Sequence, residues 1–326
     1  DSYPLPHIDT CVNSLKGASW FSTLDLRSSY YNVPIAEKDR DKTAFITRRG
    51  QFRFTVMPFG LTAAPSTFQR LMDLVLVGLT YESVMVYLDD IVVFSPTFES
   101  HIQRLQQVFE RLRQAGLKLK GSKCDLFQRQ VHFLGFQLSG NGLTVTKSKC
   151  AAVTNWPVPL TLSETRAYLG FCSYYRRLIK GFADIAAPLH ELTRKNVPFH
   201  WGPEQQKAFD ELKLRLTTAP VLAMPTDDDT FILDTDSSDK SCGAVISQIQ
   251  DGVERPIAFA SRSLNTAERA YSTTRKELLA VVFWSKTISD VSTRPVICHP
   301  HRPLCFAVAT ENTGTRGATG TMVGIH

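Results

Sequence analysis

FSTLDL (residues 21–26) and VMVYLDD (residues 84–90) are the two stretches that decide how this sequence folds. Both are apolar runs containing aromatic and β-branched residues, which favour strands. Asp25 lies inside the first run, and Asp89 and Asp90 follow the second, where another apolar run begins at once. We therefore predict two strands over residues 83–94, joined by a tight turn that carries the paired acids.

Each acidic stretch alone has an ordinary structural interpretation. Asp25 alone would be a turn or helix-cap residue, and Asp89-Asp90 alone would be a polar hairpin turn. Carboxylates that meet at the edge of one sheet, however, can hold two divalent cations about 3.5–4 Å apart. Mg²⁺ prefers such hard oxygen ligands together with phosphate oxygens, and without a cation the repulsion would raise one carboxyl pKa. The pattern therefore predicts a site that transfers a nucleotide to a 3′-hydroxyl.

Periodicity and turn residues predict the elements around these acids. Ser163 is the expected N-cap of one helix, and Gly116 is expected to end another. The predicted elements are a hairpin at 43–57, helices at 63–77, 101–117, 164–179, 203–216 and 267–284, an apolar segment at 131–138 and strands between 230 and 248.

Three more motifs follow in order: MPFGL (57–61) with Pro65 and Phe68-Gln69, GLKL (116–119) with SKC (122–124), and FLG (133–135). With FSTLDLRSSY (21–30) and YLDD (87–90), they resemble the motifs of reverse transcriptases from gypsy-type LTR retrotransposons. The resemblance covers roughly residues 1–285. Five motifs in the family's order make it specific, which YLDD alone would not be. Ala63 departs from the family, which usually has Asn there.

The resemblance implies a role for each matched residue. Asp25 and Asp89 would bind the catalytic Mg²⁺ (or Mn²⁺) ions, with Asp90 beside them. Tyr30 would be the steric gate against a ribose 2′-hydroxyl; without the motif it would be a core aromatic next to Tyr31.

Further roles follow from the later motifs. Phe59 and Gly60 would lie near the incoming nucleotide and the template. Lys123 would be a general acid toward pyrophosphate, and its alternative is a solvated surface lysine. The primer grip would be formed by Phe133, Leu134 and Gly135.

A second acidic strand, FILDTDSS (231–238), is followed by a strand containing GAV (243–245) and by a helix that begins near Glu277. Alone, Glu277 would be a surface acid in a first helical turn. The order acidic strand, second strand, acidic helix resembles the RNase H domain of the same elements. By that resemblance Asp236 and Glu277 bind metal for cleaving the RNA strand of a hybrid. Asp234 is the less favoured acid because Asp236 directly precedes the two small serines.

Two parts of the family pattern are not found. The RNase H domain needs a third acid on a later strand, and only Asp290 and Glu311 follow Glu277. Codons can be chosen for residues 289–295 and 298–307 so that a shifted reading frame resembles the family. This suggests a frameshift, so we expect the tail to be disordered or poorly packed. The basic, strand-rich fingers segment that the family has upstream of Pro4 is also missing. Arg48, Arg49 and Arg53 remain on the hairpin (43–57).

The implied fold class is α+β: a right-hand polymerase palm and helical thumb/connection, then a truncated mixed α/β RNase H-like domain. The expected parts are residues 1–145 (fingers remnant and palm), 146–225 (thumb/connection), 226–285 (N-terminal half of the RNase H-like domain) and 286–326 (the divergent tail).

Composition is consistent with a globular, nucleic-acid-binding protein. Residues 1–220 have a net charge of +8 and residues 221–326 a net charge of −2, so the first part would attract a polyanion; a solvated basic surface explains the excess equally well. Seven scattered cysteines without a C-x-x-C pair favour reduced thiols in an intracellular, cytoplasmic protein. Cys298, His299, His301 and Cys305 are too crowded for a typical zinc site. No apolar run is long enough to span a membrane.

The leading hypothesis is an RNA-directed DNA polymerase with an incomplete RNase H activity. Its partners would be an RNA template, a DNA primer, the RNA–DNA hybrid and dNTPs, with no membrane, and in a precursor other Pol segments such as protease and integrase. An intact element would place it in a virus-like particle. The alternative is a catalytically inactive relic that at most binds nucleic acid. A stand-alone nuclease is weaker because the nuclease half is the damaged one.

Overall fold

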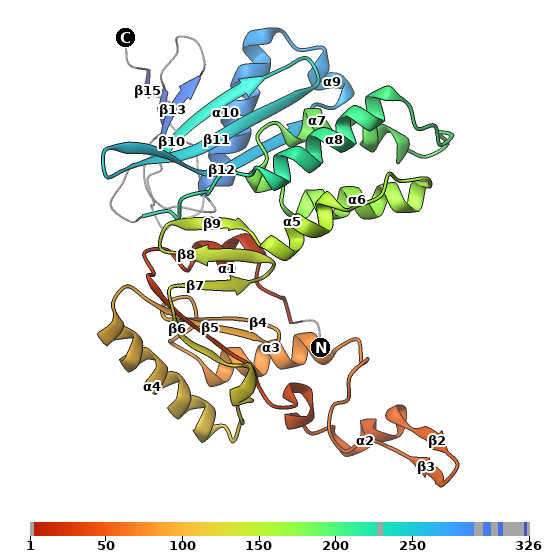
Figure 1. Ribbon diagram of the computed structural model, residues 1–326, viewed down its shortest axis with the longest axis vertical. Coiled ribbons are helices and arrows are strands. Elements are labelled where there is room, and N and C mark those ends of the chain that lie inside the picture. Colours follow the sequence, from red (N-terminus) through yellow and green to blue (C-terminus); the bar gives the residue numbers. More distant parts are fainter. Residues whose placement is uncertain (1–2, 227–230, 290–295, 301–305, 309–322, 325–326) are drawn as a thin grey trace. The chain divides into compact units, whose positions relative to one another are not determined.

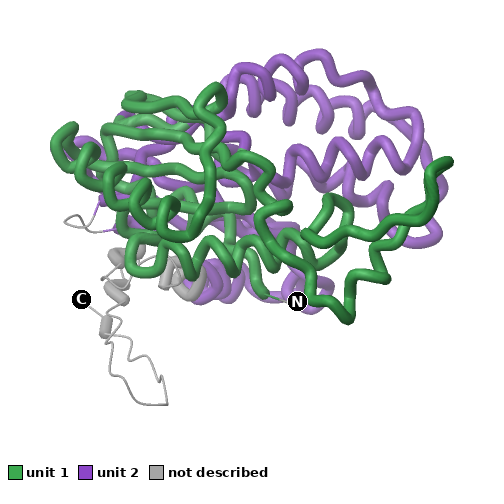
Figure 2. The backbone as a smooth tube through the Cα atoms, turned by 90° about the horizontal axis from the view of Figure 1, so that it is seen from below, with its two compact units in different colours: residues 1–134, 138–140 green, residues 135–137, 141–326 purple. Residues whose placement is uncertain are grey.

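The chain forms two compact units in a computed structural model that describes residues 3–226, 231–289, 296–300, 306–308 and 323–324. The first unit comprises residues 1–134 and 138–140, and the second residues 135–137 and 141–326. Figure 1 labels the elements and Figure 2 colours the two units separately. Within the described residues, no helix combines the length and apolarity needed to cross a bilayer.

A four-stranded sheet with the order β4-β5-β1-β6 is the framework of the first unit. The central pairs β4–β5 and β1–β5 are antiparallel. β4 and β5 are buried along nearly their whole length, whereas β6, at the edge of the sheet, is exposed. The strands are β1 (Trp20–Leu24), β4 (Val84–Tyr87), β5 (Asp90–Ser95) and β6 (Asp125–Gln128).

Two helices, α3 (Ala64–Val75) and α4 (Phe98–Gln114), pack against this sheet. Their buried side chains join those of Leu24, Val86 and Ile91 in one hydrophobic core. On α4, Leu105 and Leu112 are fully buried, and each contributes about 1.5–3 kcal/mol through removal from water. This packing holds the strand ends that carry the acids.

The remaining elements of the first unit are short. The hairpin β2–β3 extends from the body of this unit (Figure 1), and the stacked rings of Phe45 and Phe52 lie on it with centroids 5.9 Å apart. The short elements are α1 (Ile8–Asn13), η1 (Ser29–Asn32), α2 (Glu37–Arg40), η2 (Asp41–Thr43), β2 (Phe45–Thr47), β3 (Gly50–Phe52) and η3 (Gly121–Lys123).

Three strands lie where the chain passes from one unit to the other. They are β7 (Gln130–Phe133), β8 (Phe136–Ser139) and β9 (Gly142–Val145). Gly142 has φ +131°, and a Cβ there would lie 2.1 Å from the backbone oxygen of Leu222. Only glycine therefore permits the backbone pairing of Leu143 with Leu222.

The second unit begins with a helical part and continues with a sheet. α7 packs against α8 and also against strand β12 of the sheet. The helices are α5 (Lys147–Thr154), α6 (Leu162–Tyr174), η4 (Arg176–Leu178), α7 (Phe182–Leu192) and α8 (Pro203–Thr217).

The sheet of the second unit has the order β12-β11-β10-β13-β14-β15. β10 pairs antiparallel with β11 and parallel with β13. α10 packs against β10 and β11, and Leu233, Ala280 and Trp284 are part of the resulting core. The elements are β10 (Phe231–Ser237), β11 (Ser241–Gln250), β12 (Val253–Ser263), α9 (Thr266–Arg269), α10 (Thr273–Ser289), β13 (Val296–Pro300), β14 (Phe306–Val308) and β15 (Val323–Gly324).

Several expected boundaries are wrong for local reasons. α4 begins at Phe98, because Thr97 and Ser100 form a reciprocal capping box. α6 begins after Thr161, whose hydroxyl accepts the Glu164 amide hydrogen, so Ser163 is not the cap. The expected helix 267–284 is two helices, since α9 ends before Tyr271. The apolar segment 131–138 turns between β7 and β8.

The expected disordered tail needs a correction for the residues that the structure describes. α10 continues to Ser289, and β13 forms a parallel ladder with β10 from Phe231 to Thr235. Backbone pairing to a buried strand explains this order, since it depends little on the side chains. β13 contains no Asp or Glu. Asp290, Glu311 and most of the tail lie outside the described residues.

Candidate functional site

The acids of the first unit meet at one end of its sheet. Asp25 directly follows β1, and Asp89 sits in the turn between β4 and β5, at whose start Asp90 lies. The β1–β5 ladder ends by pairing Leu24 with the residue after Asp90. The structure therefore brings together the three predicted carboxylates, as strand pairing requires.

Their electrostatics are those of a crowded acidic site. Burial raises the pKa of the Asp90 carboxyl, and the charges of Asp89 and Asp25 raise it further. One carboxylate oxygen of Asp89, Oδ1, is buried, and no donor in the described part of the chain reaches it. Lys123 Nζ lies 3.3 Å from Asp25 Oδ2. Crowded charge and an unsatisfied buried oxygen both favour a bound cation.

The carboxylate oxygens of these acids are suitable ligands for a divalent metal ion, since Mg²⁺ prefers oxygen ligands of this kind. Across the described residues, however, no three His, Cys, Asp or Glu side chains are close enough together to hold an ion. The acids thus approach one another without forming a finished coordination shell. The assignment of Asp25 and Asp89 as metal ligands stays a prediction.

Tyr30 lies in η1 next to this cluster. Its ring packs against Phe59 and Phe68 with centroid distances of 5.0 and 5.5 Å. Burial raises the pKa of Tyr30, and the Asp89 charge raises it further. Tyr30 is therefore a buried aromatic beside Asp89, and its role as a steric gate stays a prediction. Phe59 is 60% exposed, and Gly60, with φ +92°, turns the chain toward α3.

A basic cavity that the motifs did not predict lies beside Asp25. It has a volume of about 520 Å³ and is lined by Arg27, Ser28, Leu119, Lys120 and Gly121. The backbone N–H of Lys120 donates to the Asp25 carbonyl oxygen at 2.8 Å, which fixes the cavity next to the acid. The signal in the sequence was the three lysines, Lys118, Lys120 and Lys123, within residues 116–123.

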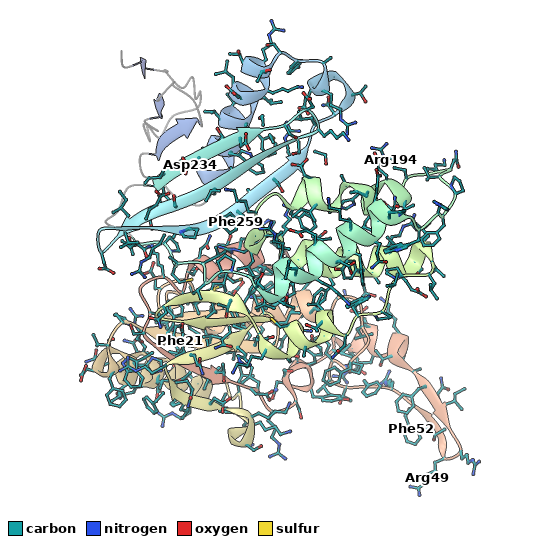
Figure 3. The ribbon with its side chains drawn as sticks, turned by 45° about the horizontal axis from the view of Figure 1, so that its top comes forward. Phe21, Arg49, Phe52, Arg194, Asp234 and Phe259 are labelled. Carbon is teal, nitrogen blue, oxygen red and sulfur yellow. The ribbon has the colours of Figure 1, made fainter. Side chains whose placement is uncertain are left out.

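The hairpin β2–β3 carries basic residues outward. Figure 3 shows Arg49 at its tip and Phe52 on its strand. Arg53 instead pairs with Glu37 and Asp41 at the hairpin's base. Of the three arginines that the hairpin retains, Arg53 is therefore engaged in ion pairs within the protein.

The residues expected to grip the primer form a tight left-handed turn. Leu134 and Gly135 have φ values of +49° and +75°, and Phe133 before them is buried. The hydroxyl of Tyr175 donates to the Gly135 carbonyl oxygen at 3.2 Å. A Cβ at Gly135 would lie 2.7 Å from that hydroxyl oxygen, so the close approach needs glycine.

In the second unit, Asp236 lines a cavity of about 150 Å³ with Asp234 and with Asp184 of α7. Asp234 and Asp236 are two residues apart on β10, so their side chains leave the same face of the sheet; Figure 3 labels Asp234 on that strand. Asp184 Oδ2 accepts a hydrogen bond from the Ser241 hydroxyl at 2.6 Å. Glu277 does not line this cavity.

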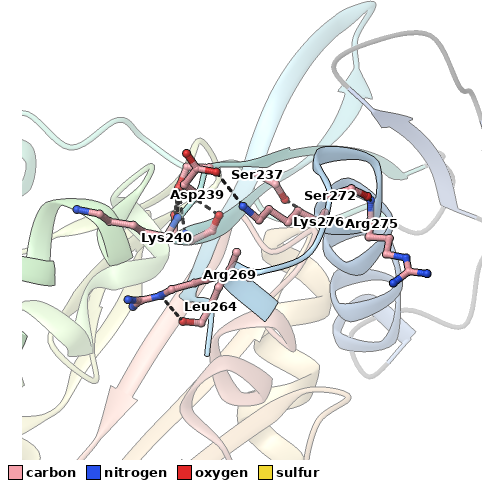
Figure 4. Close-up of polar contacts among 10 residues, drawn as sticks. Ser237, Asp239, Lys240, Leu264, Arg269, Ser272, Arg275 and Lys276 are labelled. Carbon is pink, nitrogen blue, oxygen red and sulfur yellow. Dashed lines mark hydrogen bonds and ion pairs between the residues drawn. The ribbon is translucent and has the colours of Figure 1, made fainter. Parts of the chain in front are cut away.

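Glu277 is exposed on α10, whereas its neighbour Lys276 is buried. Lys276 Nζ lies 2.8 Å from Asp239, and its carbonyl oxygen accepts from the Ser237 hydroxyl, as Figure 4 shows. Ser237 therefore faces α10, and Asp236, one residue away, faces the opposite side of the strand. The structure does not gather Asp236, Glu277 and a third acid into one site among the described residues.

Comparison with family models identifies two regions. Residues 1–138 match "Reverse transcriptase (RNA-dependent DNA polymerase)". Residues 201–310 match "RNase H-like domain found in reverse transcriptase". The second match begins before α8 and so assigns that helix to the RNase H-like part.

Curated relatives are transposon polyproteins. The Retrovirus-related Pol polyprotein from transposon 412 of Drosophila melanogaster is 37% identical over 97% of this chain and 26% of its own length. That from transposon gypsy of the same organism is 35% identical over 97% of the chain and 32% of its length. The Transposon Tf2-3 polyprotein of Schizosaccharomyces pombe is 31% identical over 95% and 24%. The chain thus spans about a quarter to a third of the length of these relatives.

Solved structures share the fold. A foamy viral protease-reverse transcriptase dRH in complex with ds DNA superposes with a TM-score of 0.82 at 24% identity, covering 92% of this chain and 53% of that one. A foamy viral protease-reverse transcriptase in complex with RNA/DNA hybrid gives 0.78 at 24% identity, covering 92% and 41%. The expected fold class, a polymerase-type α+β part followed by an RNase H-like part, is confirmed.

Proposed function

This chain belongs to the reverse transcriptase family and carries an RNase H-like part, and from that premise we propose that it copies RNA into DNA. As a segment of a gypsy-type retrotransposon Pol polyprotein, it would add dNTPs to the 3′-hydroxyl of a DNA primer paired with an RNA template. The convergence of Asp25, Asp89 and Asp90 at one sheet end, with Asp89 Oδ1 buried and unpaired, carries this proposal.

Asp25 and Asp89 would hold divalent cations, Mg²⁺ or Mn²⁺, with Asp90 beside them. Such ions, when bound, lower the pKa of the attacking hydroxyl and neutralise charge on the leaving pyrophosphate. The protein's part is to hold the carboxylates in place before substrate arrives. The pKa of Asp90 is raised first by burial and then by the charges of Asp89 and Asp25, and the charge repulsion is the part that a bound cation would relieve.

The surrounding residues would position the substrates. Tyr30, packed on Phe59, would limit the room beside the sugar and so exclude a 2′-hydroxyl. The glycine turn at Gly60 would leave space for the nucleotide. Lys123, 3.3 Å from Asp25 Oδ2, would supply a positive charge and a proton to pyrophosphate.

The chain would bind the phosphate backbone of nucleic acid, because residues 1–220 have a net positive charge. Phe133, Leu134 and Gly135 would grip the primer strand, because their left-handed turn presents backbone rather than side chains. RNA template, DNA primer, their hybrid and dNTPs are therefore the proposed partners. In a precursor, protease and integrase segments would be attached.

The RNase H-like part would be incomplete as a nuclease. Asp236 and Glu277 are its proposed metal ligands, but Asp236 faces away from α10 and strand β13 supplies no acid. We propose that it binds the hybrid while cleavage is weak or lost. The intact element would work in the cytoplasm within a virus-like particle.

The test is primer extension on an oligonucleotide-primed RNA template with Mg²⁺ or Mn²⁺, using the whole chain and its Asp89→Asn variant. Extension that disappears in the variant is the expected result, because the metal ligand is lost while shape is kept. Hybrid binding without extension by the unmodified chain would instead favour the inactive relic.

A further inference from the structure

The turn that presents Asp89 is strained. Leu88, immediately before Asp89, has φ +55°, in the left-handed region. A non-glycine residue there costs on the order of 1–2 kcal/mol, and such a conformation persists only where its surroundings hold it. Something outside the turn must therefore supply the restraint.

Gln69 of α3 supplies it through two hydrogen bonds. Its Oε1 accepts the Leu88 backbone N–H at 2.9 Å, and its Nε2 donates to the Val86 carbonyl oxygen at 3.2 Å. The side chain is 1% exposed, so water does not compete for these bonds. One amide thus clamps the backbone on both sides of Tyr87, just before the acids.

A second set of contacts orients this amide. Gln69 Nε2 also donates to Asp73 Oδ1 at 3.2 Å, and the other oxygen, Oδ2, accepts from the Tyr3 hydroxyl at 2.7 Å. That hydrogen bond is the main cause of the raised pKa of Tyr3. An ionised carboxylate accepts and never donates, so Asp73 requires the NH₂ side of Gln69 and leaves Oε1 for Leu88.

We propose that Gln69 is a positioning residue for the polymerase reaction, which it serves by fixing the Leu88 backbone so that Asp89 is held ready to bind metal. Asp73 and Tyr3 form its outer support. The inference rests on the proposed function, because it concerns the same acids. It adds a residue that touches neither nucleotide nor metal and acts only through the turn.

The experiment compares the whole chain with Gln69→Leu and with Gln107→Leu, the same change at an exposed position of α4. Binding of Mn²⁺ is measured by electron paramagnetic resonance with a dideoxy-terminated primer on its RNA template and the next dNTP, so that no chemistry occurs. Single-nucleotide incorporation gives kcat and KM, and fluorescence anisotropy gives the Kd for primer–template. Gln69→Asn, which keeps the amide but is one methylene shorter, is the conservative variant if the leucine variant does not fold.

Gln69→Leu should weaken Mn²⁺ binding and lower kcat by about 10- to 100-fold, the usual effect of losing a partner behind a metal ligand. Gln69→Asn should lie between it and the unmodified chain. The Kd for primer–template should stay within about twofold, because no nucleic-acid contact is removed, and Gln107→Leu should change nothing.

Unchanged Mn²⁺ affinity and kcat in Gln69→Leu would overturn the inference, as would equal losses in Gln69→Leu and Gln107→Leu. Failure of the unmodified chain to extend a primer would contradict the proposed function but would not by itself contradict the positioning role of Gln69. In that case a loss of Mn²⁺ affinity confined to the Gln69 variants would still support the positioning role, and its absence would end it.

Discussion

Two sheets of this chain carry carboxylates, and the two sheets differ in how these acids can be brought together. In the first unit, Asp25 and Asp89 flank strands that are direct antiparallel neighbours, so strand pairing alone brings them together. In the second unit, Asp236 lies on β10 and Glu277 on α10, and the strand on the other side of β10 has no acid. A site shared by a strand, a helix and a later strand fails when any one of them is altered. A site on adjacent strands needs fewer separate elements, although the turn that presents Asp89 is still held by Gln69 of α3.

The largest expected effect tests whether only the first site supports polymerisation. Asp25→Asn should lower single-nucleotide incorporation by about 100- to 1,000-fold, the size typical of removing a preorganised charge partner. Asp236→Asn should leave it within about twofold, with incorporation rates measured side by side. Equal losses in both variants would break the distinction between the sites.

The core beneath the first site is the next test. Phe68→Ala should lower the free energy of unfolding of the first unit by about 3–5 kcal/mol, because a fully buried ring that packs on Tyr30 is lost. Urea unfolding followed by hydrogen exchange in residues 84–95 measures it. Leu74→Ala on the same helix, at a side chain 67% exposed, is the control and should stay within about 0.5 kcal/mol. Similar effects for both would contradict the assigned core.

A smaller effect is expected where the second unit begins. Gly135→Ala should destabilise by about 1–2 kcal/mol, because the residue has φ +75° and its new Cβ would press on the buried Tyr175. Hydrogen exchange in residues 136–145 would report the change. Gly121→Ala, at an ordinary φ with nothing within 4 Å of the new Cβ, should have no such effect. If Gly135→Ala left the stability unchanged, the close approach of Gly135 to Tyr175 would not require glycine.

The smallest effect is a pH dependence of the first unit. His101 is fully buried between Ser22 and Ser95, with nitrogen–oxygen distances of 2.7 and 3.0 Å, and burial lowers its pKa below 6.5. The folded state therefore binds fewer protons than the unfolded state, so stability should fall as pH drops from about 6.5 toward the lower folded value. The test is to measure the urea concentration at the midpoint of unfolding at several pH values between 7.5 and 5, with unfolding followed at residues 91–95. His101→Gln should flatten the slope, and an unchanged slope would assign it to other groups.

Strand and helix patterns near the first site were predictable because they are local. The two strands over 83–94 with their acidic turn, the helix α3 and the helix α8 match the expected positions. The boundaries that failed depended on capping hydrogen bonds, as at Thr97 and Thr161. Several Ser and Thr residues lie near each helix start, and hydrophobic periodicity does not show which of them is the N-cap.

Contacts between distant segments could not be predicted. Phe68-Gln69 was recognised as part of a motif, but nothing local showed that Gln69 would bond to the backbone of Leu88. Asp184 gave no signal as a neighbour of Asp236, because α7 and β10 are far apart in sequence. The order of β13 was also missed, since a backbone ladder can form on a segment whose side chains lack periodicity.

By itself the sequence determined which residues carry charge, which runs become strands, and that Asp89 and Asp90 lie at the turn between two strands, whereas Asp25 reaches them through the long-range pairing of β1 with β5. It did so because side-chain period and turn chemistry act over a few residues. Only the tertiary structure decided that Gln69 restrains the turn and that Asp236 faces away from the helix bearing Glu277. Those outcomes depend on which face of one element packs against another, which is set by burial across the whole unit.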